Sequence, residues 1–395
     1  MTEPLVEKVL LVVCDGVGIG QARDAAAYGD EGANTLGNTS RAVGGIDAPN
    51  LERLGLGCLA QIEGMGCSPS PGTAHGRLME SSSAKDSTTG HWELACLVTD
   101  RGFPLFPTGF PAAIISAFER AIGRSVLANR PASGTDVIAE FGEEHLRTGS
   151  PIVYTSGDSV FQIACHDAVA DVETLYTWCR IARDLLAGED NVGRVIARPF
   201  SGQPGHFFRT AGRRDLSVPP PTETLLDRCE RTGIPVSGVG KIGDIFTMRG
   251  LAVSRPSSSN DEGVDIAIRL LAEPGPSLVF VNLVDFDSEY GHRNDPSGLA
   301  ACVESFDLRL PELMRAVGEG VLFVTGDHGC DPTTPSTDHS REMVPVLVSG
   351  PFDGVVDLGT RPTFADLGAT VGELLGVSTD GLAGEGFLGD LGMRS

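Results

Sequence analysis

Three apolar runs, each followed closely by aspartate, constrain the fold of this chain more than any other feature. They are VLLVVC at residues 9–14, LVFVNLV at 278–284 and VLFV at 321–324. A strand that is apolar at every position is typical of a parallel sheet covered on both faces, whereas a half-exposed strand alternates apolar and polar residues. The sequence therefore predicts an α/β core with a parallel sheet between layers of helices.

Side chains that bind metals follow all three runs. They are Asp15 after the first run, Asp287 and His292 after the second, and Asp327, His328 and His339 after the third. The carboxyl ends of parallel strands meet along one edge of an open sheet, where ligands bind. Carboxylate oxygen and imidazole nitrogen without cysteine suit manganese, zinc or iron. For any one run taken alone, the alternative is that the residues after it lie in a solvated loop and that its histidines are unrelated to a metal site. Together the runs predict two divalent cations, roughly 3.5–4 Å apart, that serve phosphoryl transfer.

The stretch KDSTTGHWE, residues 85–93, contains three adjacent hydroxyl side chains, Ser87, Thr88 and Thr89. One interpretation is a helix N-cap, with a glutamate further along the first turns. The other is a hydroxyl nucleophile at a helix N-terminus, where free N–H groups and the helix dipole stabilise phosphate. The two interpretations are compatible.

The character of the sequence changes between residues 101 and 217. This segment opens with the Pro/Phe-rich FPLFPTGFP, mixes short strands with helices, and gathers Arg194, Arg198, Arg209, Arg213 and Arg214. Helix–strand alternation resumes afterwards. We therefore predict a discontinuous core of residues 1–100 and 218–395, with a smaller α+β domain, residues 101–217, inserted in it. A solvated basic face is the simplest interpretation of the arginines alone.

Charge and cysteine usage limit the partners and the location. A formal net charge of −23 over 395 residues argues against nucleic acid and anionic membranes, so a phosphate substrate would need local positive charge from cations or a few arginines. No apolar run is long enough to span a membrane, and the N-terminus lacks the basic region of a secretory signal, which predicts a cytoplasmic protein. Nine scattered cysteines without a CxxC pair predict reduced thiols rather than disulfides.

The chain resembles the phosphopentomutase family of the alkaline phosphatase superfamily almost from end to end. The motifs that carry the resemblance include DGVGIG, DEGANTLGN, KDSTTGHWE, NRPASGTDVI, TSGDSVFQIACHD, VGRVIARPF, GKIGDIF, NLVDFDSEYGHRNDP and GDHGCDPTTPSTDHSRE. The resemblance implies an alkaline-phosphatase-like doubly wound core with an inserted smaller α+β cap domain. It also implies interconversion of ribose 1-phosphate with ribose 5-phosphate, and of their 2-deoxyribose counterparts, through a phosphoenzyme and a bisphosphate intermediate.

The same resemblance implies roles for individual residues. One Mn²⁺ ion would be held by Asp15, Asp327 and His328 or a similar subset, and a second by Asp287, His292 and His339. The family's nucleophile is a threonine, and alignment on GHW puts Ser87 at its position, whereas Thr88 or Thr89 would require a register shift. Distal phosphate and sugar would be bound by Ser156, Asp158, Arg194 and Lys241, and a sugar bisphosphate such as glucose 1,6-bisphosphate would act as activator.

Three other functions use the same residues. A metal-dependent phosphatase or phosphodiesterase would share the machinery and differ only in its final acceptor, water. A cofactor-independent phosphoglycerate mutase would have a longer chain and a different cap. A catalytically inactive metal-binding protein would not be expected to retain six ligand residues together with a hydroxyl at the nucleophile position.

Overall fold

A computed structural model describes residues 3–156 and 159–393 of the chain. It divides into two compact units, the first comprising Met1–Gly102 and Pro220–Ser395 and the second Phe103–Pro219. The chain thus leaves and re-enters the first unit close to the two crossing points that the change in sequence character predicts. Each unit has its own sheet and its own hydrophobic core.

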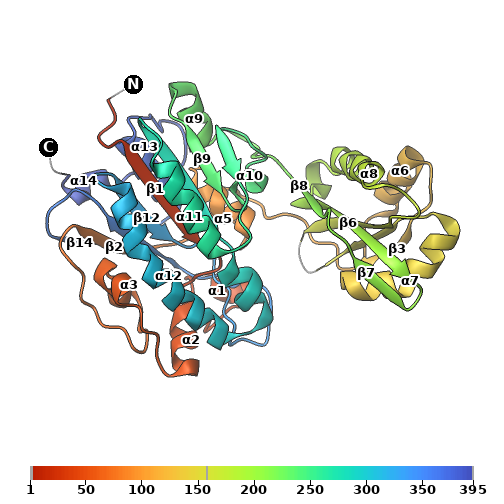
Figure 1. Ribbon diagram of the computed structural model, residues 1–395, viewed down its shortest axis with the longest axis horizontal. Coiled ribbons are helices and arrows are strands. Elements are labelled where there is room, and N and C mark those ends of the chain that lie inside the picture. Colours follow the sequence, from red (N-terminus) through yellow and green to blue (C-terminus); the bar gives the residue numbers. More distant parts are fainter. Residues whose placement is uncertain (1–2, 157–158, 394–395) are drawn as a thin grey trace. The chain divides into compact units, whose positions relative to one another are not determined.

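The first unit is built on an eight-stranded sheet (Figure 1). Its strands, in spatial order, are β10 (Val253–Arg255), β9 (Val236–Val239), β11 (Ser277–Leu283), β1 (Lys8–Cys14), β12 (Val321–Thr325), β13 (Val344–Ser349), β2 (Thr73–Leu78) and β14 (Val355–Arg361). The three apolar runs form β11, β1 and β12, which are adjacent and parallel. The predicted central parallel sheet is confirmed. β13, however, is antiparallel to both of its neighbours.

Helices cover both faces of this sheet. The α-helices of the unit are α1 (Ala25–Tyr28), α2 (Thr35–Val43), α3 (Pro49–Leu54), α4 (Leu56–Leu59), α5 (Ser87–Leu94), α9 (Leu225–Thr232), α10 (Ile242–Ile245), α11 (Asn260–Leu271), α12 (Pro296–Val317), α13 (Ala365–Leu374) and α14 (Leu388–Leu391). Figure 1 shows α11 and α12 in front of β1. Leu10 and Val12 of β1 pack into the core formed with α2, α3, α11 and α12. On the other face, α5 packs with α13 and α10.

The second unit is a mixed sheet between two helical layers. Its strands are β3 (Leu127–Pro131), β4 (Ile152–Thr155), β5 (Val160–His166), β6 (Arg194–Gln203), β7 (His206–Arg209) and β8 (Arg214–Ser217), in the order β3-β4-β5-β6-β7 with β8 also paired to β6. Its helices are α6 (Ala112–Ile122), α7 (Gly134–Thr148), α8 (Val172–Leu185) and the 3₁₀ turn η1 (Gly188–Asp190). Residues of α6 and α8 share one core, whereas α7 packs on a separate cluster.

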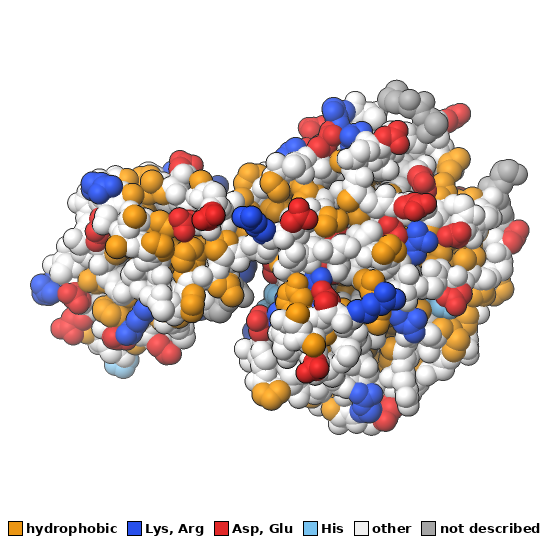
Figure 2. Space-filling view, turned by 180° about the vertical axis from the view of Figure 1, so that it is seen from behind, with side chains coloured by type: hydrophobic (Ala, Val, Ile, Leu, Met, Phe, Trp, Pro, Cys, Tyr) orange, Lys and Arg blue, Asp and Glu red, His pale blue; other side chains and the backbone are white. Residues whose placement is uncertain are grey.

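The surface bears mixed charge. Figure 2 shows acidic and basic side chains interspersed over the face in view. Among the helices of the described residues, none is both long and apolar enough to cross a membrane.

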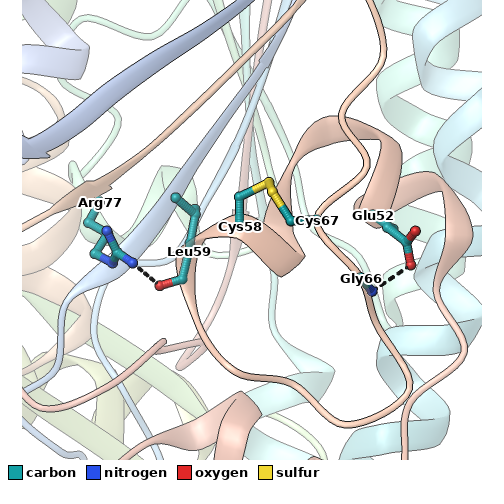
Figure 3. The surroundings of a disulfide bond; sticks show 6 residues. All are labelled: Glu52, Cys58, Leu59, Gly66, Cys67 and Arg77. Carbon is teal, nitrogen blue, oxygen red and sulfur yellow. Dashed lines mark hydrogen bonds between the residues drawn. A yellow bond between two sulfur atoms is a disulfide. The ribbon is translucent and has the colours of Figure 1, made fainter.

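The prediction that no disulfide forms is wrong. Cys58 in α4 is bonded to Cys67 in the loop that follows (Figure 3). The loop can fold back this closely because Gly57 has no side chain: a Cβ there would lie 2.0 Å from the carbonyl oxygen of Gly66. Spacing in the sequence does not reveal this approach. The seven other cysteines are free thiols, as predicted, and all but the half-buried Cys302 are buried.

Candidate active site at the carboxyl edge of the central sheet

Helix α5 begins at Ser87, so this hydroxyl lies at a helix N-terminus, as predicted. The preceding Asp86 is the N-cap, and its carboxylate accepts hydrogen bonds from the N–H groups of Thr88 and Thr89 at 3.0 and 3.1 Å. The hydroxyl of Thr89 donates back to Asp86. The helix is therefore capped, but by Asp86 rather than by one of the three hydroxyl side chains, and Ser87 lies at its first position.

The loop before α5 is fixed by charged side chains. Arg341 is buried, and its guanidinium donates to the carbonyl oxygens of Ser82 and Ala84 at 2.8 and 2.6 Å. Lys85 forms an ion pair with Asp30 at 2.9 Å. These contacts hold the backbone that leads into Ser87, so the position of the hydroxyl is set by tertiary structure as well as by its helix.

Asp15, directly after β1, is fully buried and touches the hydroxyl of Ser87. Its Oδ1 lies 3.3 Å from Ser87 Oγ, and its Oδ2 accepts hydrogen bonds from Lys241 Nζ at 3.2 Å and Asn282 Nδ2 at 3.0 Å. Burial opposes ionisation, but the positive charges of Lys241 and His328 hold the pKa of Asp15 well below its usual value. His328 Nε2 lies 3.1 Å from the same hydroxyl. Ser87 is thus contacted by a carboxylate and an imidazole.

Asp287, His292 and His339 form one group that could hold a cation. The Nε2 atoms of the two histidines lie 3.2 and 3.6 Å from the Asp287 carboxylate and 3.2 Å from each other. Each Nδ1 faces a backbone carbonyl, that of Thr337 for His292 and that of Lys85 for His339. Because a carbonyl only accepts, Nδ1 carries the proton, and a neutral ring then turns the Nε2 lone pair toward the group. Lone pairs this close favour a cation between them.

A second group consists of Asp15, Asp287 and His328, with ligand atoms all within 4.8 Å of one another. Asp287 belongs to both groups and could therefore bridge two ions. Asp327 lies beside the second group: its Oδ1 accepts from the N–H of Gly16 at 3.0 Å, and its Oδ2 lies 3.4 Å from His328 Nε2. Within the described part of the chain, Asp327 Oδ2 and Asp287 Oδ1 are buried without a hydrogen-bond donor. Such orphaned carboxylate oxygens fit a metal centre.

The charge state of Asp287 is set by its neighbours. Burial and the charge of Asp15 favour the protonated acid. When both imidazoles carry a second proton, the hydrogen bond from His292 and the charge of His339 outweigh these effects and lower the pKa of Asp287 to about 2. Asp287 is therefore ionised at neutral pH, which is the form that binds a cation.

The predicted substrate-binding residues lie in different places. Lys241 lies in the first unit, against Asp15. Ser156 follows β4 in the second unit, and Arg194 begins β6, with its guanidinium 3.7 Å from Asp215. Asp158 falls outside the described residues.

Two residues of the site did not emerge from the sequence. His91 lies one turn after Ser87 on α5, with its Nδ1 2.7 Å from the Ser87 carbonyl oxygen and 3.1 Å from Asp327 Oδ2. Asn282, the polar residue within the second apolar run, lies with its Nδ2 3.2 Å from His91 Nε2 and also contacts Asp15. The four-residue spacing of Ser87 and His91 could have indicated a shared helix face.

Comparisons with known proteins identify the family. A sequence model of the metalloenzyme superfamily matches residues 7–379. A phosphopentomutase of Dictyoglomus thermophilum is 52% identical over 97% of this chain and 98% of its own, and one of an Anaeromyxobacter species is 53% identical over 97% and 99%. A solved Pyrococcus horikoshii protein shares the fold, with a TM-score of 0.50 and 15% identity over 95% and 99% of the two chains. The expected alkaline-phosphatase-like core is confirmed. The chain belongs to the phosphopentomutase family and is an enzyme of that kind.

Proposed function

We propose that this enzyme interconverts ribose 1-phosphate and ribose 5-phosphate, and their 2-deoxyribose counterparts, through a phosphoserine at Ser87. The observation that carries the proposal is the position of the Ser87 hydroxyl, at the first residue of α5 and within 3.3 Å of both Asp15 and His328. A hydroxyl in this position lies at the positive end of the helix dipole and beside Asp15 and His328, two side chains that can bind a cation. Thr89 is less suited, because its hydroxyl is engaged by Asp86.

The donor set suits two Mn²⁺ ions. Asp287, His292 and His339 would hold one ion, and Asp15 and His328 with the adjacent Asp327 the other, with Asp287 available to both. When bound, the ions would neutralise charge on the transferred phosphoryl group and lower the pKa of the attacking hydroxyl. Mixed aspartate and histidine ligands favour manganese, zinc or iron over magnesium.

The reaction needs two transfers at one serine. Phospho-Ser87 gives its phosphoryl group to the free anomeric hydroxyl of ribose 5-phosphate, forming ribose 1,5-bisphosphate and free serine. The serine hydroxyl then takes the 5-phosphoryl group, which releases ribose 1-phosphate and restores phospho-Ser87. Phosphate is neither gained nor lost, so a sugar bisphosphate such as glucose 1,6-bisphosphate is needed only to prime an unphosphorylated enzyme. The positive end of the α5 dipole would stabilise charge on the transferred group.

Sugar and distal phosphate are assigned to polar residues of both units. Ser156, Asp158 and Arg194 of the second unit would bind the part of the substrate away from the reacting atoms, and Arg194 offers the fork of donors that phosphate prefers. Lys241 would add positive charge beside Asp15, which it already contacts. These sites would supply the local positive charge that an acidic chain needs for an anionic substrate. Location in the cytoplasm stays a prediction from the N-terminal sequence.

Phosphorus-31 NMR tests the proposal directly. The Mn²⁺-loaded protein is given ribose 1-phosphate and a trace of glucose 1,6-bisphosphate. Conversion to ribose 5-phosphate with little inorganic phosphate is the expected result. Steady release of inorganic phosphate would mean that water is the acceptor, and the enzyme would then be a phosphatase on the same core.

A further inference from the structure

The proposed reaction leaves two buried polar side chains of the first unit without a task. They are His91, one turn after Ser87 on α5, and Asn282, which interrupts the apolar run of β11, and both are 0% exposed. A buried polar side chain costs stability unless its hydrogen bonds are made. The partners of these two side chains therefore indicate what they do.

The ring of His91 is oriented by contacts at both of its nitrogens. Nδ1 lies 2.7 Å from the carbonyl oxygen of Ser87, which only accepts, so this nitrogen carries the proton. Nε2 then accepts from the Nδ2 group of Asn282 at 3.2 Å. The ring also stacks on Phe280 of β11, with centroids 5.8 Å apart. His91 thus ties the backbone of Ser87 to β11.

The same two side chains contact the carboxylates of two candidate ligands. His91 Nδ1 lies 3.1 Å from Asp327 Oδ2. Because the proton of Nδ1 is directed at the Ser87 carbonyl, this carboxylate oxygen keeps its lone pairs. The second hydrogen of the Asn282 amide goes to Asp15 Oδ2 at 3.0 Å. The His91–Asn282 pair therefore links the two carboxylates.

The backbone fixes both ends of this link. Asn282 is paired with Val13 in the ladder between β11 and β1, two residues before Asp15. At the other end, α5 packs directly on the backbone of Asp327, since a Cβ on Gly90 would lie 2.2 Å from the Asp327 carbonyl oxygen. Neutral donors hold carboxylates in place without cancelling the negative charge that attracts a cation. The pair is therefore suited to orient ligands rather than to bind an ion itself.

We propose that His91 and Asn282 are positioning residues, which fix the two carboxylates they contact relative to the backbone of the nucleophile. Both carboxylates have an oxygen 3.4 Å from His328 Nε2. A shift of either one would separate atoms that could bind a cation together. That Ser87 is the nucleophile rests on the proposed function, whereas the effect of the pair on cation binding does not.

Titration of the full chain with Mn²⁺, followed by the electron paramagnetic resonance of the free ion, tests this role. His91→Leu and Asn282→Leu should each weaken binding at one site about 10- to 100-fold, the usual effect of losing a residue that orients a ligand. The double variant should bind about as weakly as the weaker single variant, because both residues act through one link. His75→Leu removes a buried histidine of β2 that packs against Gly55, and as the matched control it should bind like the wild type.

Two conservative variants separate positioning from packing. Asparagine places an amide N–H group where His91 has Nδ1, so His91→Asn should recover most of the affinity for Mn²⁺. Glutamine places its amide near the position of Nε2, so His91→Gln should bind as weakly as His91→Leu. A side chain that only fills space predicts the opposite order, because glutamine is larger and a better helix former than asparagine. If the melting temperature shows that His91→Leu does not fold, these two variants carry the test.

Steady-state kinetics relate the pair to the reaction. At saturating Mn²⁺, Asn282→Leu should lower kcat about 10- to 100-fold with little change in KM for ribose 5-phosphate, since the pair orients ligands and not the sugar. A raised KM at unchanged kcat would contradict the role. Wild-type affinity for Mn²⁺ in both leucine variants, or tighter binding by His91→Gln than by His91→Asn, would overturn it even if NMR shows mutase activity. Weakened Mn²⁺ binding that His91→Asn restores, in a chain that releases phosphate to water, would keep the role and reject the mutase.

Discussion

The two units bury histidines in opposite surroundings. In the first unit, His328 is 1% exposed, and its Nε2 lies 3.4 Å from carboxylate oxygens of both Asp15 and Asp327. Burial alone would lower the pKa of this imidazole, but the negative charges of Asp327 and Asp15 outweigh burial and raise it well above its usual value. The two carboxylates therefore stabilise the protonated form of the His328 imidazole.

In the second unit, His145 is fully buried, and no carboxylate of the described residues contacts it. Its Nδ1 lies 2.7 Å from the carbonyl oxygen of Ser150, and its Nε2 accepts from the N–H of His166 at 2.8 Å. Its ring lies 5.5 Å from that of Phe200. Burial lowers the pKa of His145, although the hydrogen bond to Ser150 acts against it. This imidazole is neutral, with both nitrogens satisfied.

Two equally buried histidines therefore differ in charge state because their partners differ. His328 lies beside carboxylates, whereas His145 is bonded to a carbonyl oxygen and a backbone N–H group. A cluster of buried charges with orphaned oxygens costs stability and is retained for its chemistry. A neutral, fully hydrogen-bonded imidazole among aromatic rings contributes to stability. Substitutions in the first unit should accordingly change activity and metal content, and substitutions at His145 should change stability.

Ser87→Ala should have the largest effect on activity. Removal of the nucleophilic oxygen should lower kcat by roughly 10⁴-fold or more. The surrounding carboxylates and imidazoles remain, so the Mn²⁺ content measured by mass spectrometry should not change. Thr88→Ala is the matched control and should keep most of its activity. Substantial turnover by Ser87→Ala together with an inactive Thr88→Ala would identify Thr88 as the nucleophile and reject the assignment to Ser87.

Substitutions should show which residues serve one cation-binding group and which serve both. Asp287→Asn removes the charge that both groups share, so the variant should lose both ions on dialysis, whereas His292→Ala should lose one. Activity should fall at least about 100-fold in each case, since ligands matter more than the outer residues that orient them. The metal content of the dialysed proteins is the measurement. Equal losses in the two variants would show that Asp287 does not serve both groups.

His145→Leu should lower the stability of the protein without changing its metal content. It leaves the carbonyl of Ser150 and the N–H of His166 without partners in the core, which should lower the free energy of unfolding by about 2–5 kcal/mol. The Mn²⁺ content should stay at the wild-type value. Urea unfolding gives the stability, and His206→Leu on exposed β7 is the control, expected within about 0.5 kcal/mol of the wild type. Loss of metal from His145→Leu at unchanged stability would contradict the comparison.

The central sheet and the candidate ligands could be predicted because they depend on local pattern. Apolar runs mark β1, β11 and β12, and the rule that strand ends share an edge brings Asp15, Asp327 and Asp287 together without further information. The direction of β13 could not be predicted. Its run VPVLVS is buried on both faces in either orientation, so its pattern is the same for a parallel and an antiparallel neighbour.

Other features depend on approaches between segments that no local pattern records. His91 and Asn282 join the site only because α5 packs near β11, which brings their side chains within 3.2 Å. The Cys58–Cys67 bond depends on a loop that folds back over a glycine. The arginines beside Tyr154 resemble a solvated basic face in the sequence, and only the structure shows the buried hydroxyl among them.

The pH dependence of stability tests the contrast between His145 and His328 through the smallest expected effect. Because the pKa of His145 is lower in the folded than in the unfolded chain, the unfolded state binds more protons between the two values, and stability falls as the pH drops below about 6.5. One such group contributes at most about 1.4 kcal/mol per pH unit. Urea unfolding between pH 7 and 5, followed by the fluorescence of Trp178 in a Trp92→Phe background, reports on the second unit, because these are the two tryptophans of the chain. His145→Leu should flatten the slope by that contribution, since leucine takes up no proton in either state. An unchanged slope would mean that His145 is protonated in the folded unit, and the contrast with His328 would then lie in geometry rather than in charge.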